Sequence, residues 1–133
     1  MRKLARESAF KTIYKSLFLN ENYEVDEILE EDNIIEDDDK AFVCEIVNLY
    51  KENKDSILQK IKNKSNGFSL DRIYKIDLAI MGEALAEILY FKKTPFKVVV
   101  NEAVEMAKKY STEKSYSFIN GILKSIIEEE NVV

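Results

Sequence analysis

The chain contains almost none of the two residues that most often interrupt regular backbone structure. It has three glycines and one proline among 133 residues. A sandwich or barrel of many short strands needs such residues at its frequent turns, whereas glycine and proline weaken helices. The composition therefore favours an all-α fold. A chain of this length buries enough surface for a core of its own, so we expect residues 1–133 to form a single domain.

Apolar residues recur at helical spacing along most of the chain. The segment over 70–91 is apolar on most sides, which predicts a position at the centre of a bundle. Together the patterns predict about seven helices, over 4–19, near 24–31, from 37 through an apolar stripe ending at Tyr50, over 54–64, within 70–91, from Pro95 to Tyr110, and from a capping Ser115 onward.

Asn120 and Gly121 form a dipeptide typical of hairpin turns, but an apolar stripe of helical period runs through them. We expect a helix at this point, with Gly121 kept small because a neighbouring helix passes close by. We also expect the amides of Asn101 and Asn120 to form hydrogen bonds across the helices that carry them.

The charge of the chain is unevenly distributed. The formal net charge is −5, but residues 1–20 carry +4, residues 21–39 carry −11 and residues 40–133 carry +2. Residues 21–39 hold eleven acids and no base. A basic body with a separate acidic segment is compatible with a polyanionic partner. The alternative is that the lysines only solvate the surface and the acids only improve solubility and helix N-termini.

The chain lacks the residues that most catalytic and metal-binding sites require. The chain has no histidine and only Cys44, which excludes histidine-based triads, internal disulfides and multi-cysteine metal sites. Glu83/Glu87 and Glu102/Glu105 are paired carboxylates, but di-iron bundles also need histidine. The glycines are too far apart for a phosphate-binding loop. We therefore expect a binding protein, neither an enzyme nor a holder of a metal or cofactor. The chain shows no membrane span or signal peptide, so we expect it in the cytoplasm.

Four segments carry family motifs in a fixed order. The third reads Val-Asn-Glu-Ala-Val-Glu-Met-Ala-Lys over residues 100–108 and is the most specific. The four segments, in chain order, are Ala5–Tyr14 with Ala-Arg-Glu at its start, Asp77–Met81 followed by Glu87–Tyr90, Thr94–Lys108, and Ser115–Leu123. In this order they resemble the motifs of the NusB family of transcription antitermination factors.

The resemblance implies an all-helical fold of two small bundles. It further implies a bacterial, non-enzymatic factor that binds boxA-type RNA in nascent ribosomal RNA transcripts together with NusE, a ribosomal protein. Other Nus factors and RNA polymerase are the implied further partners. The family resemblance leaves both a monomer and a homodimer open.

The resemblance also implies which residues contact the partners. Glu87 matches a glutamate that faces NusE, so we expect it to serve an interface and to contribute little to the fold. Cations hold the backbone of single-stranded RNA and aromatic faces stack its bases. The residues implied to contact RNA are Arg2, Lys3, Arg6, Tyr14, Lys114 and Phe118. Tyr14 and Phe118 also fit apolar core stripes, so core packing stays the alternative for these two. Phe18 is predicted only as part of the apolar face of the first helix.

Two other functions fit the same residues. One is a protein adaptor whose basic surface is incidental. The other is a helical domain akin to the one that precedes some ribosomal RNA methyltransferases, which requires a glycine-rich cofactor-binding domain beside it.

Overall fold

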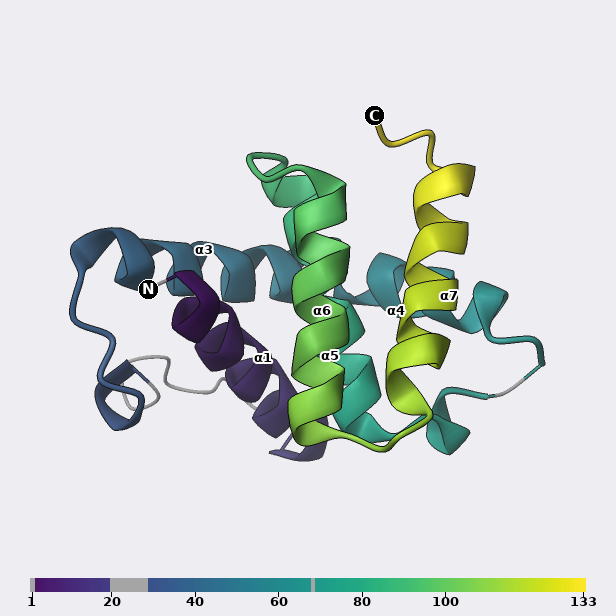
Figure 1. Cartoon of the computed structure of the whole chain (residues 1–133), viewed down its shortest axis with the longest axis horizontal. Helices are drawn as coiled ribbons and strands as arrows, with labels where there is room; N and C mark the ends of the chain where they lie inside the picture. The colour runs from purple at the N-terminus through teal and green to yellow at the C-terminus, as the bar shows by residue number, and fades with distance from the viewer. Residues whose placement is uncertain (1, 20–28, 68) are drawn as a thin grey trace.

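The computed structural model describes residues 2–19, 29–67 and 69–133, and every regular element in these ranges is helical (Figure 1). The elements in chain order are α1 (Arg2–Leu19), α3 (Asp37–Glu52), α4 (Lys54–Lys64), the 3-10 turn η1 (Leu70–Arg72), α5 (Lys75–Leu85), the π-helical stretch η2 (Ala86–Phe91), α6 (Phe96–Tyr110) and α7 (Ser115–Glu129).

The predicted helices agree with these elements apart from one segment and some ends. The helix predicted near 24–31 lies mostly outside the described residues, although 29–31 are helical. The apolar segment over 70–91 divides into η1, α5 and η2, because Ile73 and Tyr74 have extended backbone. Apolar residues surround this break on all sides, so periodicity alone could not reveal it.

Helix α5 lies at the centre of the molecule, as its composition predicted. It contacts α1, α3, α4, α6 and α7, and every residue from Asp77 to Leu85 is buried. Helices α1 and α3 pack on one part of α5, while α4, α6 and α7 pack on the rest (Figure 1). The fold is thus two small helical bundles that share α5.

The glycine that permits a close helix approach is Gly82, not Gly121. A Cβ atom added at Gly82 would lie 2.8 Å from Cε1 of Tyr50 on α3 and 3.6 Å from Cγ2 of Ile13 on α1. At Gly121 an added Cβ would meet no heavy atom of the described residues within 4 Å. The expectation of a close neighbour at Gly121 was therefore wrong, although the helix predicted through it is present.

The amides of Asn101 and Asn120 do not form the predicted bonds across helices. Asn101 is exposed and Asn120 is half-buried, and neither amide has a hydrogen-bond partner among the described residues. Both line a groove between α6 and α7. Family-like motifs at these positions therefore contribute to the surface of the α6–α7 pair, whose core is built from the apolar stripes.

Within the described residues, no helix combines the length and the apolar character that crossing a bilayer would need.

Candidate nucleic-acid interface

Arg6 and Glu87, which sequence analysis assigned to two different partners, are bonded to each other. The Nε atom of Arg6 donates to Oε1 of Glu87 at 2.9 Å, and an Nη atom donates to Oε2 at 2.8 Å. Arg6 is 6% exposed and Glu87 is 0% exposed. A two-point pair of this kind fixes both position and angle, so it holds α1 against η2. The burial contradicts the expectation that Glu87 contributes little to the fold, while contact of Arg6 with RNA and of Glu87 with NusE stays a prediction.

A second buried carboxylate lies beside this pair. Burial first, and then the neighbouring charge of Glu87, raise the pKa of Glu83 well above its ordinary 4.5. Burial is the largest single influence on Glu87 and acts to raise its pKa, but the hydrogen bonds from Arg6 and Glu83 and the charge of Arg6 together outweigh burial and lower that pKa. Glu83 therefore holds the proton and Glu87 the negative charge that Arg6 neutralises.

The buried Glu83 gives a testable dependence of stability on pH. A carboxyl whose folded pKa is raised stabilises the fold below its unfolded pKa, and this contribution is lost as the pH rises through the folded pKa. Glutamine keeps the shape and a donor for Glu87 without ionising. We expect Glu83→Gln to become progressively more stable than the wild type as the pH rises above about 4.5.

Urea unfolding at a series of pH values measures this difference. Glu105→Gln, which removes an exposed carboxylate on α6, is the control and should show a nearly constant difference from the wild type. A difference for Glu83→Gln that stays flat, or that falls as the pH rises, would contradict the protonated state of Glu83.

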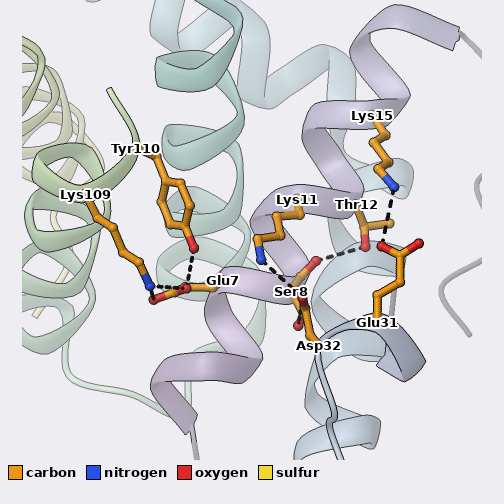
Figure 2. Close-up of polar contacts among 9 residues, drawn as sticks. All are labelled: Glu7, Ser8, Lys11, Thr12, Lys15, Glu31, Asp32, Lys109 and Tyr110. Atoms are coloured by element: carbon orange, nitrogen blue, oxygen red, sulfur yellow. Dashed lines mark hydrogen bonds and ion pairs between the residues drawn. The ribbon is translucent and has the colours of Figure 1, made fainter. Parts of the chain in front are cut away.

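The two residues after Arg6 join α1 to further elements (Figure 2). Glu7 accepts hydrogen bonds from the hydroxyl of Tyr110 at 2.5 Å and from Nζ of Lys109 at 3.0 Å. The hydroxyl of Ser8 donates to Asp32 at 2.6 Å. The pKa of Lys109 is raised, and the hydrogen bond to Glu7 is the largest cause. The opening motif therefore anchors α1 to three separate parts of the chain.

Arg2 and Lys3 present their charges at the start of α1. Both residues are exposed. The guanidinium carbon of Arg2 lies 4.3 Å from the ring centre of Phe42, and its Nε lies 3.3 Å from an oxygen of Asp39. Of the three predicted N-terminal cations, these two are therefore within reach of a ligand without rearrangement of the core.

The other end of α1 carries aromatic rings. The ring of Tyr14 is half-buried and meets that of Phe18 edge-on at 4.9 Å between centres. Phe18 is 55% exposed, so its assignment to the core stripe was wrong. The Nζ atom of Lys75, at the start of α5, lies 5.6 Å from the centre of the Phe18 ring. A cation and an open aromatic face are thus adjacent here.

A hollow of about 210 Å³ lies between the start of α5, which carries Lys75, and the start of α7. Arg72, Tyr74, Lys114 and Phe118 line it, together with the carboxylate of Asp77. Tyr74 is 62% exposed, Lys114 is exposed and Phe118 is half-buried. The hollow therefore combines two aromatic rings with two cations in the space between the start of α5 and the start of α7.

Ser115 supports the wall of this hollow and does not cap α7. The hydroxyls of Ser111 and Ser115 donate to Asp77 at 2.6 and 3.0 Å. The capping position is Lys114, and it makes no side-chain cap bond. The carboxylate of Asp77 thereby ties the α6–α7 turn to α5 and fixes the position of Lys114.

We call the group of Tyr14, Phe18, Arg72, Tyr74, Lys75, Lys114 and Phe118 the aromatic–basic surface. Its residues come from the second half of α1, from η1 and the start of α5, and from the start of α7, and these helix ends lie along the same edge of the molecule in Figure 1. Arg2 and Phe18 are separated by about 24 Å along the helix, at 1.5 Å per residue. Sequence analysis missed Phe18, Arg72, Tyr74 and Lys75. The available signal was the Arg-Ile-Tyr-Lys run at 72–75, where two cations flank an aromatic residue.

The sequence also matches a protein-family model. The NusB family model matches residues 3–128, which is nearly the whole chain. The chain belongs to the NusB family. The four sequence motifs had therefore indicated the correct family.

Individual relatives and solved structures agree. The transcription antitermination protein NusB of Finegoldia magna is 44% identical over 132 residues, which cover 97% of this chain and 95% of that protein. The NusB protein of Acetivibrio thermocellus is 38% identical over 129 residues, with 96% and 88% covered. Among structures, NusB of T. maritima has a TM-score of 0.86 at 31% identity, with 97% of this chain and 92% of that chain covered. A crystal structure of the antitermination factors NusB and NusE in complex with double-stranded RNA has a TM-score of 0.89 at 28% identity, with 96% of each chain covered.

Proposed function

We propose that this chain is a non-enzymatic RNA-binding factor of transcription antitermination in the bacterial cytoplasm. With NusE it binds boxA-type RNA in nascent ribosomal RNA transcripts, and it acts with other Nus factors and RNA polymerase. Residues 1–133 work as one RNA-binding unit. Family membership supports this proposal, as does the solved assembly of a similar NusB chain with NusE and RNA.

The observation that carries the proposal is the aromatic–basic surface. Unstacked RNA bases bind aromatic faces, while cations bind the phosphates between them. Tyr74 and Phe118 offer such faces inside one hollow, and Arg72 and Lys114 flank them. Tyr14 and Phe18 extend the aromatic faces along α1. In this assignment Arg2 and Lys3 hold phosphates at the far end of α1, and Arg6 positions α1 through its bond to Glu87.

RNA binding by variants of the hollow tests the proposal. Tyr74→Ala is expected to weaken binding of labelled boxA-type RNA by roughly 5- to 150-fold, since stacking of a base contributes about 1–3 kcal/mol. Lys114→Gln is expected to reduce the slope of log affinity against log salt by about 0.7, the value for one phosphate contact on a single strand. Fluorescence anisotropy in a salt series, with NusE present and absent, measures both.

Tyr116→Ala is the matched control. Tyr116 is another exposed tyrosine, but it lies in the α6–α7 groove with its ring 5.3 Å from Nζ of Lys108. Its removal is expected to leave RNA binding unchanged. Equal weakening by Tyr74→Ala and Tyr116→Ala would show that the hollow is not the RNA site.

A further inference from the structure

The acidic segment, defined here by its described residues 29–39, neutralises cations of α1. The Nζ atom of Lys11 lies 3.1 Å from an oxygen of Asp32, and Nζ of Lys15 lies 4.0 Å from Glu31 (Figure 2). Arg2 in turn contacts Asp39 at 3.3 Å. Carboxylates of one segment therefore pair with three of the five cations of α1.

The backbone holds these carboxylates in place. Leu29 and Ile34 are buried in the core on either side of them. The amide of Ile34 donates to the carbonyl oxygen of Leu29 at 3.0 Å, and Asn33 has a left-handed φ of 55°. This tight turn ends the helical residues 29–31 and directs Asp32 at Ser8 and Lys11. The pairing is consequently built into the fold and does not depend on a freely rotating surface chain.

The paired lysines lie beside the aromatic rings of α1. Lys11 precedes Tyr14 by three residues, and Lys15 precedes Phe18 by three, which is the spacing of neighbours on a helix surface. A phosphate backbone whose bases stack on Tyr14 and Phe18 would pass these two ammonium groups. At both ammonium groups the RNA backbone would meet a carboxylate that is already paired with the lysine, Asp32 at Lys11 and Glu31 at Lys15.

We propose that the acidic segment is an intramolecular competitor of RNA. Glu31 and Asp32 occupy Lys15 and Lys11 as phosphates would, so RNA that follows α1 must exchange these ion pairs for phosphate contacts. The exchange opposes weak binding of any polyanion through charge alone, and it leaves base stacking on the aromatic–basic surface to supply the net affinity. This inference rests on the proposed function, because it concerns the same RNA.

The test is the double variant Glu31→Gln/Asp32→Asn, which removes two charges and keeps side-chain size. Binding of labelled boxA-type RNA in the presence of NusE is measured by anisotropy across a salt series. We expect tighter binding, by up to roughly fivefold for each of the two pairs that no longer has to be broken. The salt dependence should steepen by about 0.7 for each lysine freed to meet a phosphate.

Two controls isolate the competition. Glu30→Gln/Glu36→Gln removes the same charge from exposed positions of the same segment, and it should change affinity much less. In a Lys11→Gln/Lys15→Gln background, the Glu31→Gln/Asp32→Asn change should have no effect. Glu31→Gln alone, at a side chain that is 66% exposed, keeps the test independent of any unfolding caused by the loss of Asp32.

The outcomes separate the inference from the proposed function. If the wild type binds no RNA with or without NusE, the proposed function is overturned. If the wild type binds, equal gains for the test and control pairs would assign the effect to net charge and overturn the competition. An unchanged affinity in the double variant and in Glu31→Gln would overturn it as well.

Discussion

Replacing Arg6 by methionine is expected to lower the free energy of unfolding by about 3–5 kcal/mol at neutral pH, the cost of leaving one member of a buried ion pair alone. Methionine fills a similar volume but cannot donate to Glu87. The loss should shrink toward about pH 5, because Glu87 without its guanidinium partner takes up a proton more readily as the pH falls. Urea unfolding at the two pH values measures both effects.

Arg2→Met is the matched control, since Arg2 lies four residues earlier on the same helix. Its side chain is 40% exposed and pairs with Asp39 at 3.3 Å. Because the Arg2 side chain stays partly in solvent, although Asp39 is only 6% exposed, this pair should contribute less than the fully buried Arg6–Glu87 pair. Arg6→Met/Glu87→Gln should recover part of the loss, because no lone charge remains. Similar losses for Arg6→Met and Arg2→Met would show that the Arg6–Glu87 bond does not hold the fold.

Gly82→Ala is expected to destabilise the protein. The new Cβ would lie 2.8 Å from the ring of Tyr50, which is almost fully buried and has no open side toward which to move. Overpacking of a core typically costs about 1–3 kcal/mol, which exceeds the gain of about 1 kcal/mol in helix propensity. Thermal unfolding followed by circular dichroism measures the net change.

Gly121→Ala supplies the opposite expectation in the same experiment. Helix α7 carries Gly121 at an exposed position with open space around the added atom. Only the propensity gain of about 1 kcal/mol remains, so the melting temperature should rise. If both variants raise the melting temperature, helix propensity governs both positions and the contact at Gly82 carries no strain; a fall for Gly121→Ala would contradict the open space around that position.

Periodicity predicted the helices well because most of them expose one face and bury the other. It failed in the 70–91 segment, where a helix surrounded by others has no exposed face to mark its phase. The extended residues Ile73 and Tyr74 and the π-helical stretch that begins at Ala86 leave no trace in a pattern of apolar residues. Gly82 was missed and Gly121 misjudged for a related reason, because a close approach depends on the neighbouring helix as well as on the glycine.

The candidate site was only partly predictable. Charge and family motifs indicated Lys114 and Phe118, which the fold brings to one hollow with Tyr74 and Arg72. The bond between Arg6 and Glu87 was missed because 81 residues separate them in the chain. An arginine in a basic segment is readily predicted to contact a ligand when the carboxylate that accepts its hydrogen bonds is not known. Phe18 failed in the opposite way, since its spacing fits the core stripe while its ring lies at the surface.

The anchoring of α1 has a consequence for how the protein forms on the ribosome. The partner of Arg6, Glu87, lies 81 residues later in the chain. The partners of Glu7, Lys109 and Tyr110, lie 102 and 103 residues later. At synthesis rates of about 5–20 residues per second, this interval lasts roughly 5–20 s. The helix that is made first can therefore pack on α3 and Asp32 early, but it completes its contacts only after the end of α6 has been translated. Full anchoring of α1 is thus a late, long-range event that must await translation of the C-terminal half.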